Sequence, residues 1–226
     1  MPSPPNLLND DGSASMATLL MLSHHAFRRD LGRFAKALER VAGGDTSRVD
    51  AMREEWKNFH AALHGHHHIE DTAMFPGMRA QNAELGRCID GLAADHRKID
   101  PLLEEGDRAF AQLPQAAGAR AVVAELQRLL DPHLATEEAE LVPHIRPAKE
   151  FPTPPDDAAA EMYAQGFAWS MQGIAPDVLE KVQALLPPIL TARLPAARAA
   201  FAERCEKVWG TAAAGSARTP IPTPEV

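Results

Sequence analysis

The sequence predicts an all-α protein: an antiparallel up-down four-helix bundle with additional helices at its C-terminal end. Alanine, leucine, glutamate and arginine dominate its 226 residues, and these residue types favour helix. Runs of β-branched residues, which favour strands, are nearly absent. Apolar residues recur at helical spacing through four long stretches with short connections, which is the pattern of a helical bundle.

The first two helices of the bundle have recognisable limits. The first is expected to begin after Ser13 or Ser15, either of which can cap it, and to end near residue 41, before a pair of glycines. The second is expected over 47–79. Because a proline ring clashes with the preceding helical turn, Pro76 should bend the end of this helix.

Prolines also mark the remaining helices. A third helix is expected over 83–111 with a bend at Pro101, and a fourth over 119–145 with bends at Pro132 and Pro143. The composition changes after residue 146. Two or three further helices are then expected over 156–172 and 176–209, which should pack on the outside of the bundle.

These elements divide the chain into four segments. Residues 1–12 are Pro-rich and polar and are expected to form a disordered tail, and residues 13–146 form the bundle. Residues 147–210 form a C-terminal helical extension, and residues 211–226, rich in Ala, Gly and Pro, form a second disordered tail.

Bulk properties exclude several classes of function. The formal net charge of −8 argues against a nucleic-acid partner, because phosphate binding requires a clustered positive surface. No apolar stretch is long enough to span a bilayer, and no membrane partner is expected. The isolated cysteines Cys88 and Cys205 form no disulfide framework, which is typical of a reducing compartment, so we expect a cytoplasmic protein.

An internal repeat carries the chemistry. The second helix contains HHHIEDTAMFP from His66 to Pro76, and the fourth contains HLATEEAELVP from His133 to Pro143. Each segment has a histidine, a glutamate four residues later, another acidic residue, and a proline ten residues after the histidine. The first and third helices each add one more histidine, so the order is His, then His-x-x-x-Glu, twice over.

The spacing and phase of these residues predict a buried metal site. Residues four apart on a helix share one face, so a histidine and a glutamate at this spacing can reach one ion. At about 100° per residue, all the repeated polar residues fall on the apolar side of their helices. The candidate ligands are His24, His66, Glu70, His96, His133 and Glu137.

The donor types favour particular metals. Burying four imidazoles and two carboxylates without compensation would cost several kcal/mol per group, so something must satisfy them. A mixed set of nitrogen and oxygen donors suits iron or manganese, and zinc less well. Two carboxylates among four histidines fit two ions bridged by Glu70 and Glu137.

The doubled motif resembles the hemerythrin-like cation-binding (HHE) domain family over about residues 15–146. The resemblance implies a four-helix bundle with a non-haem di-iron centre, and roles in oxygen, nitric oxide or peroxide chemistry or in sensing or holding iron. Oxygen-carrying members have a fifth histidine in a His-x-x-x-His pair on the third helix. Here the corresponding pair is His96 and Asp100, which argues against oxygen carriage.

Several neighbouring residues are weaker candidates for a role in the site. His67 and Asp71 form a rival pair four residues apart, rotated by one residue from the apolar centre, and either could orient a ligand from outside. Asp100 could be an additional oxygen ligand, and Arg28 could pair with a site acid. The remaining histidines of the second helix and Glu138 are expected at the surface, and His25 at the surface or just outside the ligands.

Three functions remain open from the sequence. The first is a metal-binding protein whose carboxylate-bridged di-iron centre takes part in iron, oxygen or redox sensing or in iron handling. The second is a di-iron enzyme that acts on peroxide, nitric oxide or O2. The third is a regulatory interaction module with a structural metal, for which manganese or zinc would also serve. Whether the protein is an enzyme stays open.

Overall fold

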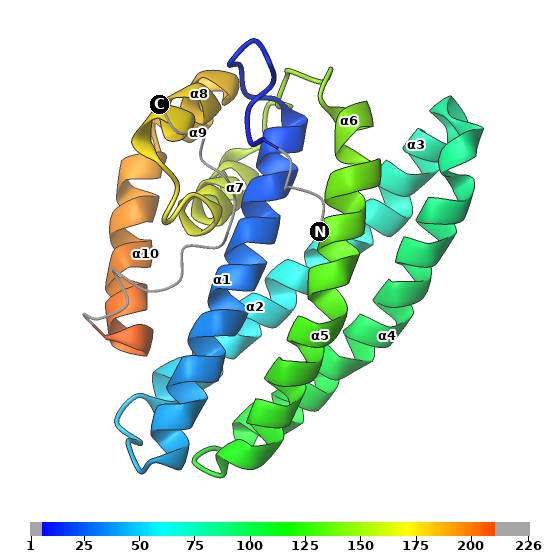
Figure 1. The fold of residues 1–226 in the computed structure, drawn as a ribbon. Coiled ribbons are helices and arrows are strands. Elements are labelled where there is room, and N and C mark those ends of the chain that lie inside the picture. Colours follow the sequence, from blue (N-terminus) through cyan, green and yellow to red (C-terminus); the bar gives the residue numbers. More distant parts are fainter. Residues whose placement is uncertain (1–5, 211–226) are drawn as a thin grey trace.

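The computed structural model describes residues 6–210, and every regular element in this part of the chain is a helix. Four long helices lie lengthwise beside one another in a bundle (Figure 1). They are α1 (Met16–Ala42), α2 (Val49–Ile69), α4 (Gly86–Ala111) and α5 (Ala116–Glu140). The tails expected at residues 1–5 and 211–226 lie outside the described residues.

The two halves of the repeat end in the same way. The helix expected over 47–79 divides into α2, a π-helical turn at Glu70–Met74, and α3 (Phe75–Gln81). The fourth helix is likewise interrupted at Leu141 and continues as α6 (Val142–Ile145). Pro76 and Pro143 each lie in the first turn of the new helix, where a missing amide hydrogen costs nothing. A short 3₁₀ helix, Ala83–Leu85, then leads into α4.

Two of the prolines expected to bend their helices lie inside long helices. Pro101 lies within α4 and Pro132 within α5, and neither ends its helix. Packing of both helices against the bundle therefore outweighs the local cost of proline.

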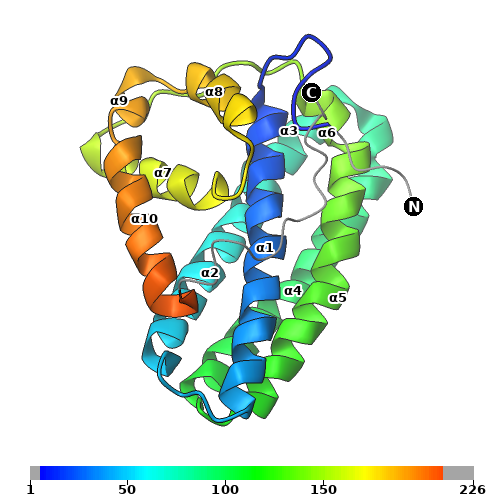
Figure 2. The same cartoon turned by 60° about the vertical axis from the view of Figure 1, so that its left-hand side comes forward.

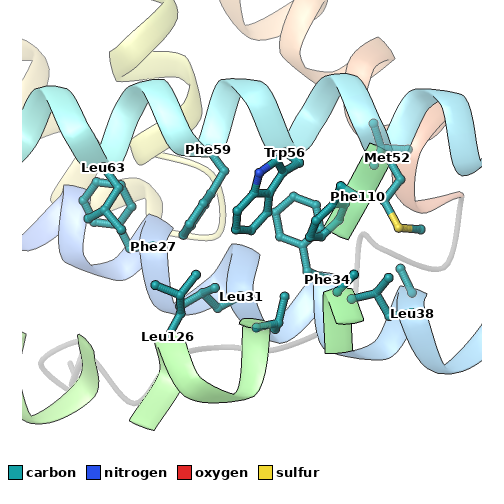
Figure 3. Close-up of a cluster of buried hydrophobic side chains, with 14 of the residues drawn as sticks. Phe27, Leu31, Phe34, Leu38, Met52, Trp56, Phe59, Leu63, Phe110 and Leu126 are labelled. Atoms are coloured by element: carbon teal, nitrogen blue, oxygen red, sulfur yellow. The ribbon is translucent and has the colours of Figure 1, made fainter. Parts of the chain in front are cut away.

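An aromatic cluster fills the core between α1, α2 and α4 (Figure 3). The rings of Trp56 and Phe110 stack with centroids 4.3 Å apart, and Phe34 meets both edge-on. Gly106 makes this arrangement fit, since a Cβ atom there would lie 1.9 Å from Cζ2 of Trp56. The cluster therefore allows close packing of α2 against α4.

The C-terminal helices cover α1 and α2 on one side of the bundle (Figure 2). They are α7 (Asp157–Ser170), α8 (Pro176–Leu185), α9 (Pro188–Thr191) and α10 (Leu194–Trp209). A buried ionic network attaches α7 to α1. Asp30 accepts hydrogen bonds from Arg29 at 2.8 Å and from Nε1 of Trp169 at 2.7 Å.

The charge of Asp30 is maintained by its neighbours. Burial favours the protonated carboxyl group, but Arg29 and Arg33 outweigh burial and hold the pKa of Asp30 below its usual value. Arg29 also donates to the backbone oxygens of Trp169 and Gln172, at 2.9 and 3.1 Å. The last turn of α7 is therefore fixed to α1 by charged hydrogen bonds.

Residues 6–12, expected to be part of a disordered tail, instead pack on the bundle. Leu7 is fully buried, and its backbone oxygen accepts a hydrogen bond from Oγ1 of Thr18 at 2.7 Å. Arg146 donates to the backbone oxygen of Leu8 at 3.0 Å. The sequence pattern missed this because one buried leucine in a polar stretch leaves no periodicity. No helix among residues 6–210 combines the length and apolarity that a bilayer crossing requires.

We predict that Gly106→Ala destabilises the protein by about 3 kcal/mol, because the added methyl group would overlap the buried ring of Trp56. Gly91→Ala on the same helix is the matched control, since a Cβ atom there meets nothing within 4 Å. Replacing this exposed helical glycine should leave stability unchanged or raise it by up to about 1 kcal/mol. Urea unfolding followed by circular dichroism measures both values, and equal effects would contradict the close contact.

Candidate metal centre

The structure brings the six candidate ligands together in the bundle interior. His24 comes from α1, His66 from α2, Glu70 from the π-helical turn, His96 from α4, and His133 and Glu137 from α5. Five of them are at most 2% exposed, and the side chain of His66 is 12% exposed. Each helix of the bundle therefore contributes at least one polar group to a single buried cluster.

Each glutamate lies between two imidazoles. Oε2 of Glu137 is 3.3 Å from Nε2 of His24 and 3.7 Å from Nε2 of His133. Glu70 has Oε1 at 3.0 Å from Nε2 of His66 and Oε2 at 3.5 Å from Nε2 of His96. All four imidazoles thus direct the same ring nitrogen, Nε2, toward a carboxylate.

His67 is a fifth imidazole of the cluster, although it lies one residue off the apolar centre of its helix. It is 1% exposed, and its ring stacks on His96 with centroids 4.0 Å apart. Consecutive residues on a helix are about 100° apart, so two of them can lie on either side of the inward direction. His66 faces α1, with its ring 5.3 Å from His24, while His67 faces α4. A helix with neighbours on both sides buries a wider face than the apolar stripe in its sequence indicates.

Asp100 and Asp71 hold the outer nitrogens of two imidazoles. Oδ1 of Asp100 is 2.6 Å from Nδ1 of His67. Oδ1 of Asp71 is 3.0 Å from Nδ1 of His96, so the rival pair of Asp71 with His67 does not form. These contacts favour the tautomer in which Nδ1 carries the proton and Nε2 presents its lone pair to the cluster.

Glu138 performs the same task for His24 and is not solvated as expected. It is 7% exposed, and its Oε1 is 3.0 Å from Nδ1 of His24. Arg28 donates to the same oxygen at 2.5 Å and to Oε2 at 3.3 Å, so its site-acid partner is Glu138. His25, also buried, lies 2.9 Å from the backbone oxygen of Gln172, because the C-terminal helices cover this face of α1.

Burial and neighbouring charges shift the pKa values of the cluster in opposite directions. Burial raises the pKa of Glu70 and lowers the pKa of His133 to about 3. Burial also acts to lower the pKa of His24, but the carboxylates of Glu137 and Glu138 outweigh it and raise that pKa to about 9. A proton on His24 therefore supplies positive charge beside Glu137 and Glu138, and a bound cation would displace it.

Several buried polar atoms of the cluster have no hydrogen-bond partner. Among the described residues, both carboxylate oxygens of Glu70 and of Glu137 are buried without a hydrogen-bond partner. The same is true of Nε2 of His24, His66 and His67. Since buried polar groups are nearly always satisfied, a cation at the centre of these atoms fits the chemistry of the donor set.

The donors form overlapping groups that could hold metal ions, with ligand atoms within 4.8 Å of one another in each group. One group is His24, His66, Glu70 and Glu137. A second is Glu70, His96, His133 and Glu137, and a third is His67, His96 and His133. Glu70 and Glu137 belong to both of the first two groups, so their carboxylates could bridge two ions.

We predict that His67→Ala weakens metal binding at least about tenfold, because it removes a buried donor and leaves Asp100 without its imidazole partner. His68→Ala changes the adjacent, exposed histidine and should leave the affinity unchanged. Titration of the metal-free variants with Co2+, followed by visible absorption, measures both. Equal affinities in the two variants would show that burial of His67 has no role in metal binding.

A family model described as the hemerythrin HHE cation-binding domain matches residues 15–145. Comparisons with curated proteins and with solved structures find no match to the chain. The matched range begins at the residue before α1 and ends with α6, so it contains every candidate ligand named above.

Proposed function

Because the chain belongs to the hemerythrin HHE cation-binding domain family, we propose that it holds a carboxylate-bridged non-haem di-iron centre and acts in iron, oxygen or redox sensing or in iron handling. The observation that carries this proposal is the pair of buried glutamates shared by two groups of histidines. A single ion would leave part of this donor set unsatisfied.

The proposed centre has two unequal metal positions. His24 and His66 would hold one ion, and His67, His96 and His133 would hold the other. Glu70 and Glu137 would be shared by both. The cluster contains five imidazoles rather than the four counted from the repeat, so the ligand count no longer argues against oxygen carriage.

Iron is proposed as the metal because five imidazoles and two carboxylates are a mixed nitrogen and oxygen donor set, which suits iron better than zinc. Manganese would fit the same donors. A bound iron pair would supply one-electron chemistry and an affinity for O2, nitric oxide or peroxide.

The surrounding residues would keep this centre dry and ordered. The ring of Phe27 lies 5.2 Å from His66, and the ring of Phe75 stacks on His96 at 5.6 Å. These rings would shield one face of His66 and one face of His96 from water. The carboxylates of Glu138, Asp71 and Asp100 hold the ligand rings in place. We also propose that α1, α2, α4 and α5, which carry the ligands, form an antiparallel up-down bundle.

A chain of ring contacts favours sensing over simple storage. Phe27 touches His66 on one side and Trp169 of α7 on the other, with centroids 5.2 and 5.1 Å apart. Movement of His66 when metal binds would therefore be transmitted to the C-terminal helices.

We place this role in the cytoplasm, because both cysteines are free thiols.

We predict about two irons per chain in protein produced with sufficient iron, since two carboxylates are shared by two groups of imidazoles. Glu70→Ala and Glu137→Ala should each lose most of this iron, because each removes a buried bridging group. Glu140→Ala, which alters an exposed glutamate of α5, is the control and should retain it. Elemental analysis measures the content, and one zinc or no metal in the unaltered chain would refute the di-iron proposal.

We predict that metal binding quenches the fluorescence of Trp169, because the contact through Phe27 joins its ring to His66. Trp169→Phe should abolish most of the quenching. Trp209→Phe removes a tryptophan of α10 whose ring contacts Phe34 instead, and it should leave the signal change intact. If Trp169→Phe retains the full quenching, metal binding does not affect α7 through Phe27.

A further inference from the structure

Three of the five histidines between residues 60 and 68 lie outside the proposed centre. His60, His64 and His68 follow one another at intervals of four residues, so they share one face of α2. The side chains of His60 and His64 are 25% and 61% exposed, and their ring centroids are 6.3 Å apart. This pair is accessible from solvent beside the buried cluster.

Carboxylates from α4 accompany the pair. Oδ1 of Asp107 is 3.0 Å from Nδ1 of His60, and Oδ2 of Asp100 is 3.8 Å from Nδ1 of His64. Helices α2 and α4 run beside each other along this edge (Figure 1). Each imidazole of the pair therefore has one carboxylate of α4 beside it at the seam between the helices.

This set has the chemistry of a weak metal site. Two histidines one turn apart on a helix can bind one divalent transition-metal ion, at about 2.0–2.1 Å from each nitrogen for zinc. The ring of His64, which is 61% exposed, can turn toward an ion bound by His60. With few protein donors the ion keeps some of its water, so it can also leave.

Asp100 connects the surface pair to the interior. Its Oδ2 faces exposed His64, while its Oδ1 is 2.6 Å from Nδ1 of buried His67. The Asp100 carboxylate thus lies between one exposed histidine and one buried histidine. Asp100 is itself 34% exposed, so it is open to an ion that arrives from solvent.

We propose that His60 and His64, together with Asp100 and Asp107, form a surface site that captures a divalent transition-metal ion and passes it inward past Asp100 to the buried centre. The transfer step rests on the proposed function. The surface site does not, because its donors are separate from the ligands of the centre, and Asp100 contacts only the outer nitrogen of the ligand His67.

A purely structural role explains only half of this arrangement. Asp107 also accepts a hydrogen bond from Nε1 of Trp56 at 2.8 Å, so His60 could serve simply to join α2 to α4. His64 makes no such link, since it is mostly exposed and 3.8 Å from Asp100, beyond hydrogen-bond distance. A metal ion between the two imidazoles gives both of them a function.

The test compares iron uptake by the metal-free full chain and a His60→Ala/His64→Ala variant. Each is mixed with Fe2+ without oxygen, and a ferrous chelator added at intervals removes iron that has not reached the interior. The double variant should end with the same chelator-resistant iron per chain but acquire it about tenfold more slowly, because the surface site no longer concentrates the ion. His144→Ala, at an exposed histidine of α6, should load at the normal rate.

A Co2+ titration tests the surface site separately. The unaltered chain should bind one more, weaker ion than the double variant, and His64→Ala alone should already weaken that ion. Equal uptake rates in the double variant and the unaltered chain would overturn the transfer, and equal Co2+ stoichiometry would overturn the site. If the unaltered chain retains no chelator-resistant iron, the di-iron proposal fails and the transfer with it, while the Co2+ result still decides whether the surface site exists.

Discussion

The burial of two glutamates without hydrogen-bond partners is the constraint on which the rest of the bundle depends. Ionised Glu70 and Glu137 would each cost several kcal/mol in this interior if nothing compensated them. The imidazoles around them provide compensation only when they carry protons or share a cation. The π-helical turn carries Glu70, and the outer carboxylates of Glu138, Asp100 and Asp71 contact the imidazoles of the cluster.

The sequence predicted most of this arrangement because the repeat carries both spacing and phase. Histidine and glutamate four residues apart, on the apolar side of a helix, specify one face without any knowledge of the neighbours. The structure accordingly brings together His24, His66, Glu70, His96, His133 and Glu137. The all-helical class followed from the same periodicity, and the family match covers the same segment.

What the sequence did not predict depends on contacts between distant segments. His67 and Glu138 lie just off the apolar stripe of their own helices, and whether they are buried depends on which helix packs beside them. Their partners, Asp100 on α4 and Arg28 on α1, lie 33 and 110 residues away. The burial of His25 has the same origin, since the turn after α7 covers it. Such positions have no local signal that distinguishes them from surface residues.

The family match ends at residue 145, but the folded unit does not end there. The ionic network joins α1, inside the match, to α7, beyond it. A chain shortened after residue 146 would lose Trp169 and Gln172, and with them the acceptors that hold Arg29. Phe27 would lose the indole that shields its outer face, and water would gain a path toward His66. The minimal unit able to keep the proposed metal centre dry is therefore longer than the domain that the motif defines, and the C-terminal helices belong to the wall of the site.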